Sequence, residues 1–434
     1  MRVCVVGGGG RLGLPIAAWS AHRGNPTKIA DIDSEQVHMV NVGCVSRLEP
    51  GVSQLVREGH ETGMLGATTN VAEGVQGADI IIVIVPTPSN GDGSFSLEYV
   101  LPACEQIARG ISSSAGAPPT IMISSTVMPG ACMGPIRGAL GVRDALSSEV
   151  VDEWPEPCGI VYSPEFVRQG SIIRDFASPD FVLIGESSDW AGSVAVEFYR
   201  SILRNNAPIA RMSVESAEIA KIGLNAAVVN KIAVANTLAM LCHEIPGADA
   251  SNVLAAVGTD ERIGSRFFNA GTWPGGPCFP RDCRALACAL ENVGVPSILP
   301  DGVSGLTGEM VYWLATKLEH LADEIGASHV GILGLAYKPG VDIIEESQGL
   351  LLANTLHVPC HTYDPVLVDP NEERRCATMA DLVRWCDVIV IMTLWPEFIA
   401  LCTADLAGKV IFDMWGVIDS DSVNCDVVVF GEGG

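Results

Sequence analysis

The chain has 434 residues, 48% of which are hydrophobic, so it can bury two or three ordinary domain cores. Its formal net charge of −25, from 26 basic and 51 acidic side chains, gives a surface that repels nucleic-acid phosphates and anionic lipids. Nucleic acid and membranes are therefore not expected as partners, and an acidic substrate would need a pocket built from the few basic residues.

The N-terminal part of the chain alternates short β-branched runs with helix-like segments. The runs are RVCVVG, PTKIAD, ADIIIVIVP, TIMISS, GIVYSP and FVLIG. This alternation predicts a parallel sheet with crossover helices. Ser213 then indicates a helix start, and no breaker interrupts the helical pattern from about 214 to 244. Such a helix would be about 45 Å long, so we expect it to connect domains or to lie in a subunit interface.

A second alternating region begins near His329, with the runs HVGILGLAY, HVPCHTYDP, DVIVIMTLW, KVIFDMW and DVVVFG. It predicts another, smaller doubly wound domain, so the overall fold class is α/β. We expect the loosest segments at 144–157 and 366–376.

The fourteen cysteines are scattered without a CxxC pair or a zinc-type Cys/His spacing, which favours free thiols, no metal site and a reducing compartment. The chain starts directly in a strand and shows no membrane-spanning apolar run, which predicts a soluble cytoplasmic protein.

A glycine-rich motif follows the first strand. Gly8, Gly10 and Gly13 form GxGxxG, which permits a tight turn and close approach of the backbone to a diphosphate at a helix N-terminus. Asp31 ends the next strand, where a ribose-binding carboxylate is expected, and its charge favours NAD over NADP. A glycine-rich turn without a ligand is the alternative.

Three further strand ends carry polar side chains, at Thr87, Thr126 and Glu165. The carboxyl ends of parallel strands face the ligand crevice, so these side chains could contact cofactor and substrate, although each alone could be an ordinary turn residue.

On the long helix, Lys221 and Asn225 share one face and could donate to a developing oxyanion, or Lys221 could be an ordinary solvated lysine.

Cys278 lies in a Gly/Pro-rich turn, with Asp282 four residues further on. A thiolate in such a turn would be accessible and could be stabilised by a helix N-terminus or a nearby cation, which suits a nucleophile. Most cysteines, however, are small core residues.

Together these segments resemble the UDP-glucose/GDP-mannose dehydrogenase family. The resemblance rests on GGGGRLGLP, VPTP, SSTV, SPEFVRQGSIIRDFASPD, AEIAKIGLN, DERIGSRFF, GGPCFPRD, GLAYKP and TLWPEF, in this order. It implies an N-terminal Rossmann domain for NAD (1–205), a long central helix with a helical dimerisation region and the cysteine loop (206–310), and a C-terminal Rossmann-like domain for the nucleotide sugar (311–434). A homodimer or a higher homo-oligomer is implied.

The resemblance also implies roles for single residues. Cys278 would be the nucleophile, Asp282 its partner in proton handling, Glu165 the general base for hydrolysis, and Lys221 and Asn225 the oxyanion donors. Thr126 would orient a water. The cofactor contacts would be Gly8, Gly10, Leu12, Gly13, Asp31, Thr87, Thr126 and Arg281. The substrate contacts would be Phe166, Val167, Arg168, Lys221, Asn225, Arg262 from a neighbouring subunit, Phe267, Gly275, Tyr337 and Lys338.

The implied activity is a four-electron, NAD-dependent oxidation of a nucleotide-sugar C6 alcohol to a uronate through a thioester, with UDP-glucose as the first choice of substrate. UDP-N-acetylhexosamine and GDP-mannose remain alternatives, as do a one-step hydroxyacid dehydrogenase and a catalytically silent binding protein. The chain departs from the family pattern at Gln169, Trp273, Pro274, Glu345 and Trp415. The last two stand where arginines are common, which bears on the choice of nucleotide sugar.

Overall fold

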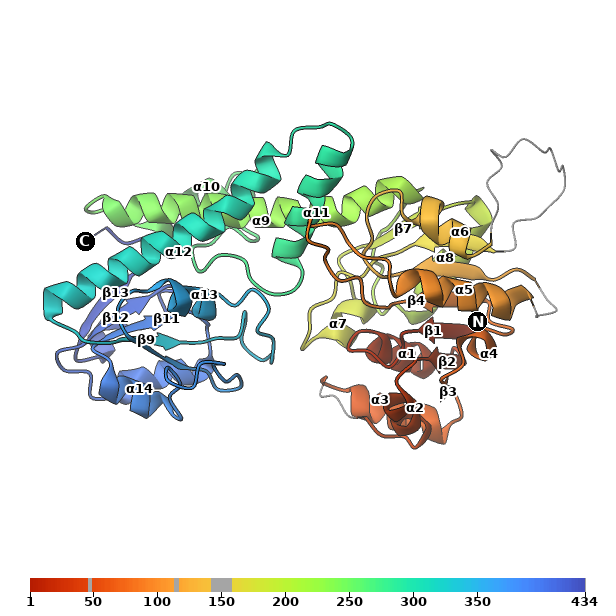
Figure 1. Cartoon of the computed structure of the whole chain (residues 1–434), viewed down its shortest axis with the longest axis horizontal. Helices are drawn as coiled ribbons and strands as arrows, with labels where there is room; N and C mark the ends of the chain where they lie inside the picture. Colours follow the sequence, from red (N-terminus) through yellow and green to blue (C-terminus); the bar gives the residue numbers. More distant parts are fainter. Residues whose placement is uncertain (46–48, 113–116, 142–157, 434) are drawn as a thin grey trace. The chain divides into compact units, whose positions relative to one another are not determined.

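The computed structural model describes residues 1–45, 49–112, 117–141 and 158–433. The chain divides into two compact units, Met1–Lys221 and Ile222–Gly434 (Figure 1). The division falls within helix α9 (Val214–Glu244), whose bounds confirm the helix predicted at 214–244. The predicted α/β class is also confirmed, since each unit contains one sheet covered by helices.

The first unit is built on an eight-stranded sheet with the order β3-β2-β1-β4-β5-β6-β7-β8. The strands are β1 (Val3–Val6), β2 (Thr27–Ala30), β3 (Leu65–Thr68), β4 (Ile80–Val83), β5 (Thr120–Ile123), β6 (Gly159–Tyr162), β7 (Val182–Glu186) and β8 (Ile209–Ser213). In β1, β4, β5 and β6 every residue is buried, as expected for strands that are covered on both faces.

Two hydrophobic cores lie on the two faces of this sheet. Helices α1 (Gly13–His22), α3 (Val52–Glu61), α7 (Ile172–Ala177) and α8 (Asp189–Ile202) contribute to one core. The other core includes residues of α4 (Val71–Gly74), α5 (Val100–Ser112) and the π-helical turn η1 (Cys132–Ile136), which continues into α6 (Arg137–Ala139). Helix α2 (Ser34–Asn41) contacts β3 at the sheet edge. Helices therefore cover both faces of the first sheet.

The predicted parallel first sheet is confirmed except for one pair of strands. Strands β6 and β7 are antiparallel, with Val161 opposite Glu186. The connection between them holds only the short helix α7, so the chain re-enters the sheet from the end at which β6 left it. Strands β3 and β8 were not predicted at all. Of the two segments predicted to be loose, 144–157 lies outside the described residues, and 366–376 contains no helix and no extended strand.

The second unit contains a five-stranded, fully parallel sheet with the order β10-β9-β11-β12-β13. Its strands are β9 (Val330–Leu333), β10 (Cys360–Tyr363), β11 (Val388–Ile391), β12 (Val410–Asp413) and β13 (Asp426–Val429). The helices and helical turns are α10 (Ala250–Gly258), α11 (Phe279–Asn292), α12 (Ile298–Ile325), α13 (Gln348–Thr355), α14 (Met379–Trp385), η2 (Pro396–Thr403) and η3 (Ser420–Ser422). The predicted second doubly wound domain is therefore confirmed.

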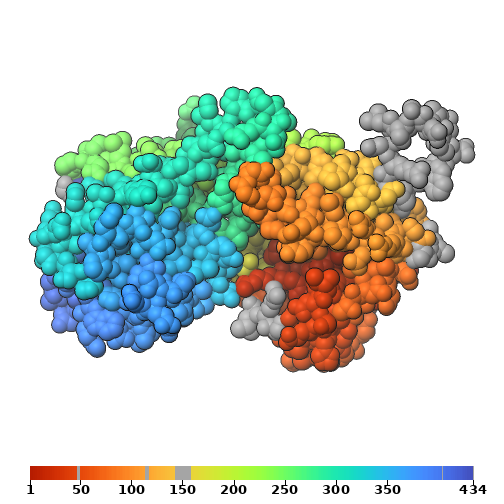
Figure 2. All heavy atoms as spheres, viewed as in Figure 1, coloured from red at the N-terminus to blue at the C-terminus, as the bar shows by residue number. Residues whose placement is uncertain are grey.

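The core of this unit has two parts. Residues of α9, α10, α12 and α13 pack on one face of the sheet, and residues of α14 and η2 pack on the other. In the space-filling view the teal atoms of α12 lie closely packed beside the blue residues of the sheet layer (Figure 2). All fourteen cysteines are free thiols, as predicted.

Helix α9 is, among the described helices, the one that is long and apolar enough to cross a membrane by length and composition. It nevertheless buries the polar side chains of Glu218, Lys221, Asn225 and Asn236. These groups have protein partners, which is typical of a core helix and costly against lipid.

Candidate active site

The glycine motif forms the turn between β1 and α1. Gly7 has a positive φ of 82°, and a Cβ at Gly13 would lie 2.4 Å from the Gly7 carbonyl oxygen. A Cβ at Gly8 would lie 2.8 Å from the Val5 carbonyl oxygen. No side chain caps the N-terminus of α1 at Leu12, although the Leu14 amide donates to the Gly10 carbonyl oxygen at 3.1 Å. A helix N-terminus without a side-chain cap favours a phosphate. The turn therefore fits the diphosphate of a dinucleotide.

Asp31 lies beside this turn, as predicted. Its Oδ2 accepts a hydrogen bond from the Gly9 amide at 2.7 Å, and its Oδ1 accepts one from the Asp33 amide at 3.0 Å. A carboxylate directly after β2, next to the glycine turn, is compatible with the predicted ribose ligand, which stays a prediction. The same charge disfavours a 2′-phosphate.

The structure brings Thr87 and Thr126 together at neighbouring strand ends. The buried Thr87 hydroxyl donates to the Thr126 carbonyl oxygen at 2.8 Å. Ser125 joins the same two loops, because its hydroxyl donates to the Val85 carbonyl at 2.7 Å and accepts from the Val85 amide at 2.9 Å. The loops after β4 and β5 therefore form one connected edge of the sheet.

Glu165 and Lys221 also lie together in the first unit. The Lys221 ammonium donates to the Glu165 carbonyl oxygen at 2.6 Å and lies 4.4 Å from the centre of the Phe166 ring. The Glu165 carboxyl group is enclosed, and its Oε1 has no hydrogen-bond partner among the described residues. Burial raises the pKa of Glu165 to about 8, although the Lys221 charge acts to lower it. A carboxyl group with this pKa can act as a base near neutral pH.

The segment after Glu165 contains the remaining predicted substrate contacts of this unit. Phe166 packs against Phe181 with 5.0 Å between ring centres, and Val167 packs on the hydrophobic core. The Arg168 guanidinium is largely exposed and pairs with Asp175 at 3.0 Å. Arg168 can therefore reach a ligand only by sharing or exchanging that carboxylate.

The sequence analysis did not predict a role in the site for two carboxylates of this unit, Glu49 and Glu218. Glu49 accepts hydrogen bonds from the Gly170 and Ile172 amides, both at 2.9 Å, and so holds the segment after Glu165. Glu218, on α9, is fully buried and accepts from the Gly130 amide at 2.6 Å and the Cys132 amide at 2.9 Å. Burial raises the pKa of Glu218, although these bonds act to lower it. Glu218 therefore fixes the loop that follows Thr126.

Cys278 lies directly before α11, and its carbonyl oxygen accepts the first helical hydrogen bond from Asp282 at 2.9 Å. Only Cys278 and Cys44 are exposed among the fourteen cysteines. The thiol is accessible at a helix N-terminus, where the peptide dipoles favour the thiolate. These two properties distinguish it from the cysteines buried in the cores.

Asp282 lies one turn into α11 and is only 1% exposed. The Asn225 side chain donates to Asp282 Oδ2 at 2.6 Å, and the Arg281 guanidinium lies 3.5 Å from Asp282 Oδ1. The second unit therefore brings together Cys278, Asp282, Asn225 and Arg281. A buried carboxylate with an amide partner can hold or pass a proton beside the thiol.

Gly275, Tyr337 and Lys338 lie around the loop that leads to Cys278. The neighbouring Gly276 amide donates to the Glu345 carbonyl oxygen at 3.1 Å, and a Cβ there would meet the Tyr337 ring at 2.6 Å. Burial, followed by the negative charges of Cys278 and Glu345, raises the pKa of Tyr337 to about 12. Lys338 lies 5.5 Å from the Tyr337 ring centre. These contacts place both predicted side chains near the cysteine loop.

Arg262 and Phe267 lie at exposed positions between α10 and the cysteine loop. Arg262 pairs with Asp260 at 2.6 Å, and its side chain is 88% exposed. Phe267 has a positive φ of 58° and is 50% exposed. An exposed aromatic ring on a strained backbone suits a surface that contacts another molecule. The predicted roles of Arg262 and Phe267 stay predictions.

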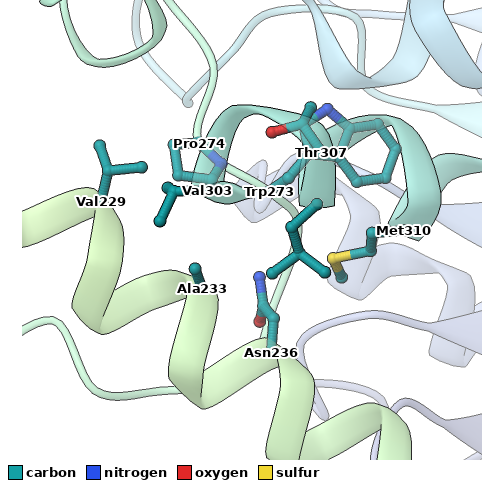
Figure 3. A pocket seen from close by; sticks show the side chains of 9 residues that line it. Val229, Ala233, Asn236, Trp273, Pro274, Val303, Thr307 and Met310 are labelled. Carbon is teal, nitrogen blue, oxygen red and sulfur yellow. The ribbon is translucent and has the colours of Figure 1, made fainter. Parts of the chain in front are cut away.

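The departures from the family pattern have structural roles. Trp273 is buried in the core of the second unit, and Pro274 lines a small apolar pocket between α9 and α12 (Figure 3). Trp415 covers Gly271 with its ring and donates to the Met392 carbonyl at 3.2 Å. Glu345 is exposed and contributes its backbone carbonyl. The half-buried Gln169 follows the predicted substrate segment.

Comparison with known proteins shows the family of the chain. Residues 1–203 match the NAD binding domain of the UDP-glucose/GDP-mannose dehydrogenase family, residues 215–304 its central domain, and residues 331–420 its UDP binding domain. The chain belongs to this family. The UDP-glucose 6-dehydrogenase AglM of Haloferax volcanii is 32% identical over 412 residues, which cover 92% of this chain and 93% of the relative.

Solved structures of family members have the same fold. A UDP-glucose dehydrogenase from Pyrobaculum islandicum gives a TM-score of 0.86 at 28% identity, covering 100% of this chain and 98% of that one. A UDP-D-ManNAc dehydrogenase from Pyrococcus horikoshii gives 0.82 at 26% identity, covering 100% of both chains. The predicted family, NAD cofactor and enzyme class are therefore confirmed: the protein is an NAD-dependent nucleotide-sugar dehydrogenase.

Proposed function

We propose that the protein oxidises the C6 alcohol of UDP-glucose to the carboxylate of UDP-glucuronate through a thioester on Cys278. The observation that carries this proposal is an exposed thiol at the N-terminus of α11, with the buried pair of Asp282 and Asn225 one turn further on. When bound, NAD accepts the hydride released in each of two oxidations. One sugar and one water therefore yield one carboxylate, two NADH and three protons.

The residues of the first unit bind the cofactor and move protons. The turn at Gly8, Gly10, Leu12 and Gly13 holds the diphosphate, Asp31 holds the ribose, and Thr87 and Thr126 form the adjoining strand-end edge. Thr126 orients a water that takes part in proton transfer. Arg281 is assigned to the cofactor.

Covalent catalysis begins once the first oxidation has produced the C6 aldehyde. The Cys278 sulfur adds to C6, and a proton passes to the carbonyl oxygen, which gives a thiohemiacetal. Lys221 and Asn225 stabilise the oxyanions of this and the later states. The second oxidation converts the thiohemiacetal to a thioester, with Asp282 handling the proton released from oxygen.

Hydrolysis completes the reaction. Glu165, ionised in a fraction of molecules near neutral pH, takes a proton from water, and the water oxygen adds to the thioester carbon. The carbon–sulfur bond then breaks, and Cys278 leaves as the thiolate. Phe166, Val167, Arg168, Phe267, Gly275, Tyr337 and Lys338 are assigned to the nucleotide sugar.

Two other nucleotide sugars are candidate substrates for this activity. UDP-N-acetylhexosamine is the second candidate, because one similar solved structure is a UDP-D-ManNAc dehydrogenase. GDP-mannose is the third candidate. A catalytically silent protein that binds NAD or nucleotide sugar would be expected to lose part of the set that contains Cys278, Asp282, Asn225, Lys221 and Glu165.

We also propose a role for each domain, a dimer and a cellular location. Residues 1–205 bind NAD, 206–310 form the dimerisation region with the cysteine loop, and 311–434 bind the nucleotide. The dimer would bring the exposed Arg262 to the substrate of the neighbouring subunit. We place the enzyme in the cytoplasm, where free thiols persist.

The test measures NADH at 340 nm with a panel of UDP- and GDP-sugars, together with the sugar consumed. The parent protein should make two NADH per sugar with UDP-glucose. Cys278→Ser should lose steady turnover, whereas the control Cys44→Ser, at the other exposed cysteine, should keep it. One NADH per sugar would contradict the thioester mechanism, and no NADH with any sugar would favour the silent binding protein.

A further inference from the structure

The loop 271–277, which leads to Cys278, is held from α9 by one buried amide. Asn236 is 1% exposed, and its Oδ1 accepts from the Gly271 amide at 3.2 Å, while its Nδ2 donates to the Thr272 carbonyl at 3.3 Å. Figure 3 shows Asn236 on α9, facing the pocket that Trp273 and Pro274 also line. This side of the loop is therefore fixed at its start.

A second buried amide holds the same loop from the sheet side. Gln348 is 4% exposed, and its Nε2 donates to the Trp273 carbonyl oxygen at 2.9 Å. The loop passes so close to this side chain that a Cβ at Gly275 would lie 2.6 Å from Gln348 Nε2. The Gln348 amide therefore contacts the loop at two positions, three and five residues before Cys278.

Gln348 is itself held rigidly. It is the first residue of α13, whose N-cap Ser347 accepts from the Leu350 amide and donates to the Leu335 carbonyl at 2.6 Å. The helix start lies against the end of β9, because a Cβ at Gly349 would be 2.2 Å from the Gly334 carbonyl oxygen. A side chain on such a support holds its partner in one position.

We propose that Gln348 is a positioning residue, which fixes the Cys278 thiol at the N-terminus of α11 by holding the Trp273 carbonyl and the turn at Gly275. It acts through the loop and is not itself a catalytic residue. Without this donor, the buried carbonyl loses its hydrogen bond and the loop gains freedom. The helix N-terminus then stabilises the thiolate less often, because the sulfur is no longer held beside it. The assignment of Cys278 as nucleophile rests on the proposed function.

Thiol reactivity tests the proposal independently of turnover. In a Cys44→Ser background, the rate of Cys278 alkylation by iodoacetamide at pH 7 is followed by peptide mass spectrometry. Gln348→Met, which keeps the length without the donor, should slow alkylation at least about threefold and lower kcat about tenfold. The KM for NAD should stay unchanged, which a general loss of structure would not produce. The control is Gln54→Met, at an exposed glutamine of α3.

Gln348→Asn provides a second variant, because it keeps a polar amide that is one methylene too short to reach Trp273. Circular dichroism and thermal melts show that each variant is folded. Unchanged alkylation rates in folded Gln348→Met and Gln348→Asn would overturn the proposal. Absence of NADH from the parent protein with every sugar would instead overturn the proposed function, while the alkylation comparison would still decide the role of Gln348.

Discussion

Replacing Glu165 with glutamine should separate stability from activity, because the folded protein holds this carboxyl group in its neutral form. Burial raises the pKa of Glu165 from 4.5 to about 8. Above pH 4.5 the unfolded chain releases this proton, whereas the folded protein keeps it until about pH 8. The free energy of unfolding of the parent should therefore fall across this window. Glu165→Gln has no proton to lose and should not show this fall.

The expected size follows from the two pKa values. Each pKa unit corresponds to ~1.4 kcal/mol, and most of the window between the two pKa values lies between pH 5 and pH 8, so we expect roughly 2 to 4 kcal/mol over this range. Relative to the parent, Glu165→Gln should gain about this amount at pH 8 and little at pH 5. Urea unfolding at both pH values measures the difference, with Glu98→Gln as a control at an exposed glutamate.

The activity of Glu165→Gln should fall, although its stability at pH 8 should rise. If Glu165 is the base, the rate of thioester hydrolysis in the parent should rise with pH towards about 8, and Glu165→Gln should lose at least about 100-fold in kcat. A variant with parental activity would remove Glu165 from the mechanism. Identical pH dependence of the unfolding free energy in Glu165→Gln and the parent would refute the inference that the carboxyl group is held neutral.

The remaining predictions concern three contacts. Asn225→Asp places a second carboxylate against buried Asp282, so kcat should fall at least about 100-fold, measured by NADH formation, whereas parental kcat would contradict the proposed pair. Asp31→Asn should raise the KM for NAD about tenfold and improve use of NADP, measured by steady-state kinetics; an unchanged KM would argue against ribose binding. Glu218→Gln should lose about 1 to 3 kcal/mol of stability in urea unfolding, and no loss would show that its two amide contacts are replaceable.

Strong local signals explain which parts of the fold could be predicted. The strands β4 and β11 are runs of buried β-branched residues, β1 is a buried run of three valines and one cysteine, and α9 has a long uninterrupted helical pattern. Strand β3, with the sequence LGAT, and the partly exposed edge strand β8 carry weak signals. The antiparallel pairing of β6 with β7 is set by tertiary packing, which strand composition does not encode.

The predicted site residues are those with a local chemical pattern, such as the glycine turn and the thiol at a helix start. Glu49, Glu218 and Gln348 were missed for a common reason. Their side chains bond to backbone groups 121, 88 and 75 residues away, at Gly170, Gly130 and Trp273. Spacing along the chain cannot reveal such partners, because they meet only when the sheet has formed.

The departures from the family pattern also gain meaning from their contacts. Trp415 stands where an arginine is common, which taken alone suggests a lost phosphate contact. In the structure its ring covers Gly271, at the start of the loop whose Trp273 carbonyl is held by Gln348. The residues at 273 and 415 therefore serve one loop, the one that carries Cys278. Because neighbouring substitutions couple energetically, restoring an arginine at 415 alone would remove packing from the cysteine loop before it could add a phosphate contact.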